Sequence, residues 1–96
     1  MFIVSLTYIC ELQEIDKILQ EHVKYLKNQY KKGNFIASGR KIPRTGGIIL
    51  SKLDNLEKLE EVLNKDPFKI NNLAKYDIQE FIPSMTNNEF SNLKEE

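Results

Sequence analysis

The chain has 96 residues, of which 41% are hydrophobic and 29% are charged, a composition typical of one small globular domain. Fourteen basic residues balance fourteen acidic ones, so no net field attracts nucleic acid or an anionic membrane surface. Cys10 is the single cysteine, which excludes an internal disulfide. The apolar start at residues 2–6 lacks a preceding basic stretch and is too short for a signal peptide or a membrane span. We therefore expect a cytoplasmic protein.

The first half of the chain predicts a strand, a helix and a second strand. Residues 2–8 are rich in β-formers, and their hydrophobicity is nearly continuous. Residues 12–32 change to a helical period, which ends at Gly33, where a left-handed conformation is often required. Residues 35–38 predict the second strand.

The second half repeats this alternation. After a loop over residues 39–46, residues 47–51 predict a third strand. Asp54, followed three residues later by Glu57, predicts a capping box and a second helix, whose apolar stripe is Leu56, Leu59, Val62 and Leu63 and which Pro67 ends. Residues 75–82 predict a fourth strand that stops at Pro83.

The order βαββαβ is that of a ferredoxin-like α+β domain, expected over residues 1–83, followed by a polar tail over residues 84–96 with room for a short helix near Phe90 and Leu93. Right-handed crossovers place both helices on one face of a four-stranded antiparallel sheet, with the first and third strands central. Ile3 and one of the pair Ile48 and Ile49 then lie on the uncovered face. A second copy of the chain is the simplest cover, so we expect a homodimer.

His22, the single histidine, is the most unusual residue of the first predicted helix. It falls on the apolar stripe formed by Ile15, Leu19, Val23, Leu26 and Tyr30. A buried imidazole needs a hydrogen-bond partner, and antiparallel packing of the helices allows Asp66 to reach it. Such a carboxylate would fix the ring's tautomer, which makes His22 a candidate general base. Taken singly, His22 is more often a core residue and Asp66 a turn residue.

The loop after the second strand is basic and rich in glycine. It carries Arg40, Lys41 and Arg44, with Gly39, Gly46 and Gly47 around them. Glycines beside cations suit close approach to an anionic ligand, but they also suit a solvated hairpin, which spacing alone slightly favours. Ser38, at the end of the second strand, could bind a ligand or pair within the sheet.

Other kinds of site have little support. One histidine and one cysteine offer no pair of metal ligands at useful spacing, and no cofactor is indicated. RNA-recognition motifs share this topology, but they stack bases on aromatic side chains of the central strands. Residues 46–51 contain no aromatic residue, so we expect no nucleic-acid partner.

Several segments together resemble the YciI-like, or YCII-related, domain family. They are Met1–Val4, His22 within residues 21–26, Phe35–Gly39, Gly46–Leu50, Asp66-Pro67-Phe68 and Tyr76–Phe81. The resemblance covers residues 1–83 and implies a dimeric α/β-barrel protein related to muconolactone isomerase. It also implies a pocket with His22 and Asp66 as an active-site pair and with Ser38 and Gly39 at its edge.

We therefore expect a cofactor-independent isomerase- or lyase-type enzyme acting on a small organic acid or oxidised aromatic derivative. His22 would move a proton and Asp66 would orient His22, while Ser38, with Arg40 or Arg44, would hold an anionic substrate beside Gly39, Gly46 and Gly47. The alternative is a non-catalytic ligand-binding or interaction module that has the same pocket.

Overall fold

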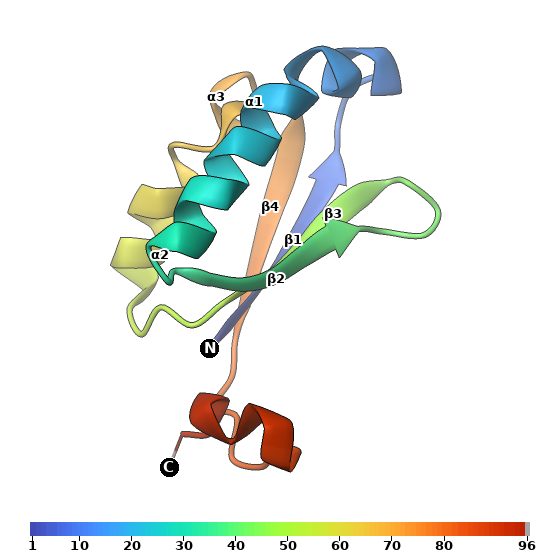
Figure 1. The fold of residues 1–96 in the computed structure, drawn as a ribbon. Coiled ribbons are helices and arrows are strands. Elements are labelled where there is room, and N and C mark those ends of the chain that lie inside the picture. The colour runs from blue at the N-terminus through green and yellow to red at the C-terminus, as the bar shows by residue number, and fades with distance from the viewer. Residues whose placement is uncertain (96) are drawn as a thin grey trace.

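The computed structural model describes residues 1–95, which form a four-stranded antiparallel sheet with helices on one face (Figure 1). The strands are β1 (Phe2–Tyr8), β2 (Phe35–Arg40), β3 (Gly46–Ser51) and β4 (Ala74–Glu80). Their order across the sheet is β2-β3-β1-β4. The first and third strands are therefore central, as predicted, and the ferredoxin-like α+β class is confirmed.

The long helix α1 (Leu12–Lys31) forms the first crossover, and α2 (Leu56–Leu63) and α3 (Pro67–Ile70) form the second. All three lie on the same face of the sheet (Figure 1). The short helix α3 contacts α1, and this contact brings the segment around Asp66 to the middle of α1. The sequence predicted one helix in this crossover, where the structure has two.

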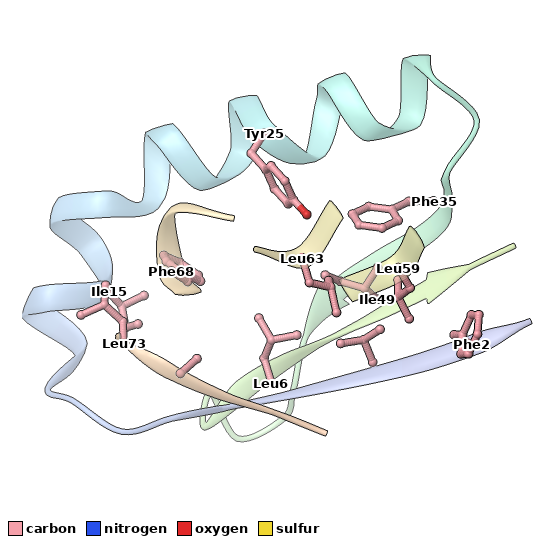
Figure 2. Packing of buried hydrophobic residues seen from close by; sticks show 12 residues of the cluster. Phe2, Leu6, Ile15, Tyr25, Phe35, Ile49, Leu59, Leu63, Phe68 and Leu73 are labelled. Atoms are coloured by element: carbon pink, nitrogen blue, oxygen red, sulfur yellow. The ribbon is translucent and has the colours of Figure 1, made fainter. Parts of the chain in front are cut away.

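The core lies between this helical layer and the sheet (Figure 2). Alternate residues of β1 point into it, because successive side chains of a strand point to opposite faces. The buried hydrophobic residues come from every layer and include Phe2, Val4, Leu6, Ile15, Tyr25, Phe35, Ile49, Leu59, Leu63 and Phe68. This packing sets the rotation of α1 about its own axis.

That rotation differs from the predicted stripe. The buried residues of α1 are Ile15, His22, Tyr25 and Gln29. Val23 is 38% exposed and Tyr30 is 37% exposed, so the prediction that both belong to the buried stripe is wrong. The helix is turned so that His22 meets α3 and Tyr25 meets α2 and β2, while Val23 lies at the wall of an open cavity.

Helix ends show one confirmed prediction and two corrections. Gly33 has a φ of +76°, the left-handed conformation expected after α1. The cap of α2 is Asn55, whose side chain accepts a hydrogen bond from the Lys58 backbone N–H at 3.1 Å, so the capping box at Asp54 is wrong by one residue. Pro67 does not end α2, which stops at Leu63; it is the first residue of α3, where a missing N–H costs nothing.

The C-terminal segment contains the 3₁₀ helix η1 (Asn88–Leu93) and lies beside the N-terminus (Figure 1). The Met1 ammonium lies 3.3 Å from a Glu95 carboxylate oxygen. β4 ends at Glu80 rather than at residue 82, although the Phe81 N–H still bonds the Met1 carbonyl. Glu96, the last residue of the predicted tail, lies outside the described residues. Over residues 1–95, no helix combines the length and the hydrophobicity of a membrane span.

Candidate active site

Asp66 is fully buried, and its carboxylate accepts three hydrogen bonds. Oδ1 accepts from the backbone N–H of Phe68 at 3.0 Å and lies 2.7 Å from Nδ1 of His22. Oδ2 accepts from the Tyr76 hydroxyl at 2.6 Å. The first of these bonds is an N-cap, and Asp before Pro is a favoured start for a helix such as α3. The residue that starts α3 is therefore also the partner of His22.

His22 lies on α1 with its ring held on two sides. Its Nδ1 faces Asp66, and its plane stacks on the Phe68 ring at a centroid distance of 3.9 Å and an interplanar angle of 7°. A carboxylate oxygen can only accept, so neutral His22 carries its proton on Nδ1 and has a lone pair on Nε2. Among residues 1–95, every fully buried side-chain nitrogen and oxygen has a hydrogen-bond partner. Nε2 of His22 makes no hydrogen bond to the described residues, so it is accessible, and the cavity that His22 lines is the space it opens to.

This cavity lies between α1 and the helix-facing side of β1, β2 and β3, and its volume is about 230 Å³. Drug-sized ligands occupy pockets of roughly 300–1,000 Å³, so the cavity suits a smaller molecule. Its walls are mainly apolar, and the lining residues are Leu6, Tyr8, Leu19, His22, Val23, Leu26, Ser38, Gly39, Arg40, Gly47, Ile48, Ile49 and Phe68. An apolar slot with a few polar groups is the usual form of a small-molecule site.

The polar groups at the β2 side of the cavity are Ser38 and Arg40. The Ser38 Oγ lies 2.5 Å from the Tyr30 hydroxyl, so the two hydroxyls form a hydrogen-bonded pair. Arg40 is the last residue of β2, and its guanidinium has no hydrogen-bond or ion-pair partner in the part of the chain that the structure describes. A guanidinium beside an apolar cavity can bind a carboxylate or a phenolate through paired N–H donors.

The other two cations of the basic loop, Arg44 and Lys41, bind partners outside the cavity. Arg44 donates to Asp16 of α1 at 2.7 Å, and Lys41 donates to the Thr7 hydroxyl at 3.3 Å. Of the two arginines considered for a ligand, Arg40 lines the cavity and Arg44 does not. Gly47 lines it too, whereas Gly46 packs against β1: a Cβ there would lie 1.7 Å from the Leu6 carbonyl oxygen.

Two tyrosines whose roles the sequence did not reveal border the pair. The Tyr25 hydroxyl donates to the Val62 carbonyl at 2.7 Å, and Figure 2 shows it pointing from α1 toward α2. The Tyr76 hydroxyl donates to Asp66. Burial, and then the charge of Asp66, raise the pKa of both phenols above the usual 10, so both stay protonated. A tyrosine on the core face of β4 was the available signal, since a partly buried hydroxyl usually has a hydrogen-bond partner.

Comparison with protein families gives a match to the YCII-related domain over residues 1–82. The chain belongs to the YCII-related domain family. Comparison with curated proteins finds no match.

A solved structure with a similar fold is that of 5-chloro-2-hydroxyhydroquinone dehydrochlorinase (TftG) from Burkholderia phenoliruptrix AC1100, in complex with 2,5-dihydroxybenzoquinone. The TM-score is 0.70 and the sequence identity is 15%, over 84% of this YCII-related chain and 93% of the other. At this identity the likeness establishes a common fold and no more.

Proposed function

We propose that this YCII-related domain is an enzyme of the lyase or isomerase type that removes a proton from a small oxidised aromatic compound or organic acid. The observation that supports this most directly is the pair of His22 and the fully buried Asp66, which leaves the second ring nitrogen facing an apolar cavity. A general base needs this combination of a free lone pair and an oriented ring.

In the proposed reaction, Nε2 of His22 takes a proton from a carbon or hydroxyl of the bound substrate. The electron pair released moves into the ring system, where it either expels a leaving group as an anion or shifts a double bond. Asp66 stabilises the imidazolium that forms, and His22 later returns the proton to product or solvent. The reaction is redox-neutral, and the chain's own residues perform these steps.

The apolar walls of the cavity and the nearby guanidinium favour a substrate with one ring and a negative charge. Leu19, Val23 and Phe68 would contact the ring faces, and Arg40 would attract a phenolate or carboxylate oxygen. The hydroxyl pair of Ser38 and Tyr30 would bind a second oxygen. The ligand in the structure of the dehydrochlorinase, 2,5-dihydroxybenzoquinone, has this combination of one ring and several oxygens, which makes hydroxyquinones the first compounds to test.

The test is to incubate the protein with halogenated and unhalogenated hydroquinones and hydroxyquinones and to follow halide release and the ultraviolet spectrum. We expect turnover with at least one compound and, in His22→Gln, a loss of at least a hundredfold, in line with the usual contribution of a general base. Lys24→Ala, an exposed change on the same helix, is the matched control and should keep full activity.

The rival function is a ligand-binding module without catalysis. Binding measured by calorimetry without turnover, or turnover that persists in folded His22→Gln, would contradict the proposal of a general base. Arg40→Gln serves as a second probe, because it should raise KM more than it lowers kcat if Arg40 only holds the substrate.

A further inference from the structure

We propose that Tyr76 is a positioning residue for the His22–Asp66 pair, and that its hydroxyl holds the Asp66 carboxylate in the orientation which presents Oδ1 to His22. The catalytic consequence rests on the proposed function, whereas the hydrogen-bond relay itself can be tested without any substrate.

The geometry of Asp66 requires a second anchor. Oδ1 serves two donors at once, the Phe68 backbone N–H and His22 Nδ1, and both approach from the helical layer. Oδ2 receives its hydrogen bond from β4, an element of the sheet, through Tyr76. The carboxylate is thus held from the sheet and from the helices, so rotation about its Cβ–Cγ bond would break contacts on both sides.

The hydroxyl of Tyr76 is chemically suited to this role. It is a neutral donor, so it orients the carboxylate and leaves its negative charge in place. A lysine or arginine there would neutralise that charge. Burial and the neighbouring Asp66 charge raise the pKa of Tyr76, so that the phenol stays a donor throughout the physiological pH range. The Lys69 ammonium lies 5.5 Å from the centroid of the Tyr76 ring, a cation–π contact that helps to fix the ring.

The bond from Tyr76 also affects how strongly the pair binds a proton. A donor on Oδ2 withdraws part of the charge of the carboxylate, but it also keeps Oδ1 at 2.7 Å from Nδ1, where that charge stabilises the imidazolium. Under the proposed positioning role, removing the donor lets the carboxylate turn from Nδ1 and makes proton uptake by His22 less favourable. Other titratable groups face the same site, namely Tyr25 from α1, Tyr8 from β1 and Arg40 from β2. A variant of Tyr76 must therefore be compared with a variant of one of these.

The experiment is NMR titration of the His22 ring in the full chain, without ligand, for the wild type, Tyr76→Phe and Tyr25→Phe. Tyr25→Phe is the matched control, since it removes a phenol hydroxyl beside the pair that donates to the Val62 carbonyl and not to Asp66. We expect the midpoint of the His22 titration to fall by roughly half to one pH unit in Tyr76→Phe, a three- to tenfold loss of proton affinity, because Oδ1 is no longer held against Nδ1. A rise would show that the hydroxyl only withdraws charge from Asp66, and it would overturn the positioning role. The midpoint should stay within about 0.2 units of wild type in Tyr25→Phe.

An unchanged midpoint in Tyr76→Phe, or an equal shift in both variants, would overturn the proposal and leave Tyr76 as a packing residue. If Tyr76→Phe does not fold, the wild type still decides the matter. The ¹³Cζ resonance of Tyr76 should follow the titration of His22, because the two groups share one carboxylate; a resonance that ignores it would refute the relay. These measurements need no turnover, so failure to find a substrate would affect the proposed function alone.

Discussion

At the scale of single residues, Asp66 combines a structural and a chemical task. The oxygen that caps α3 through the Phe68 N–H is the oxygen that meets His22. His22 is held in turn by stacking on Phe68, which belongs to the same short helix. The site is therefore built on a turn that the main chain itself stabilises, which suits a base that must keep one orientation.

The raised pKa values of Tyr25 and Tyr76 predict how stability changes at alkaline pH. Each phenol is bound more tightly to its proton in the folded chain than in the unfolded chain, whose tyrosines have a pKa near 10. The contribution of the two phenols to the free energy of unfolding is complete below pH 10, and it is lost as the pH rises from 10 toward their higher folded-state pKa values. The free energy of unfolding should fall by at most about 1.4 kcal/mol per pH unit for each tyrosine.

Chemical denaturation at pH 8 and at pH 11.5 tests this. Tyr76→Phe should cost about 1–3 kcal/mol at pH 8, because it leaves Asp66 with one donor fewer, and the cost should shrink at pH 11.5. Leu63→Ala, a buried apolar change, should cost the same at both pH values. A cost of Tyr76→Phe that does not depend on pH would mean that the phenol titrates alike in the folded and unfolded chains.

At the scale of elements, sequence periodicity located the secondary structure because it reflects local rules. The run of β-forming residues over 2–8 and the helical period over residues 12–32 match β1 and α1 within a residue. The errors arise where two local signals compete. Asp54 and Asn55 are both good caps, and the Asp66-Pro67 step is equally suited to ending one helix and to starting the next.

The β2–β3 hairpin gives a prediction at this scale. Gly46→Ala places a Cβ about 1.7 Å from the Leu6 carbonyl oxygen, so β3 must move away from β1. We expect a loss of about 3 kcal/mol or more, measured by urea denaturation, because the collision is with the backbone. Gly39→Ala is the matched control, with nothing within 4 Å of the added Cβ, and should change stability by less than about 1 kcal/mol. Equal costs for the two variants would refute this account of Gly46.

At the scale of the whole molecule, the sheet is covered on one face only. α1, α2 and α3 lie over one face (Figure 1), whereas Ile3, Ile48 and Leu50 belong to the other face and stay half-buried. The pairing of Ile3 with Leu50 across β1 and β3 makes this an apolar strip along the centre of the sheet. Such a strip is a candidate interface, and a homodimer through it stays a prediction.

Light scattering at micromolar concentration tests that prediction. We expect a dimer for the wild type and a monomer for Leu50→Lys, since a buried unpaired ammonium at the centre of the interface is costly. Ile42→Lys changes an apolar residue that is 98% exposed in the loop between β2 and β3, and it should remain dimeric. A wild-type monomer, or a Leu50→Lys variant that still dimerises, would contradict an interface on this face.

The sequence by itself determined the order of the four strands, the ferredoxin-like class and the two candidate residues of the pair, whose contact only the structure shows. These depend on local periodicity, on chain crossovers with one favoured hand, and on the presence of a single histidine. Only the tertiary structure decided that α1 turns Tyr25 inward and Val23 outward, that Arg40 rather than Arg44 lines the cavity, and that Tyr76 meets Asp66. The physical reason is that these contacts join separate elements, and their distances depend on how helices rotate and pack on the sheet, which no local pattern of residues encodes.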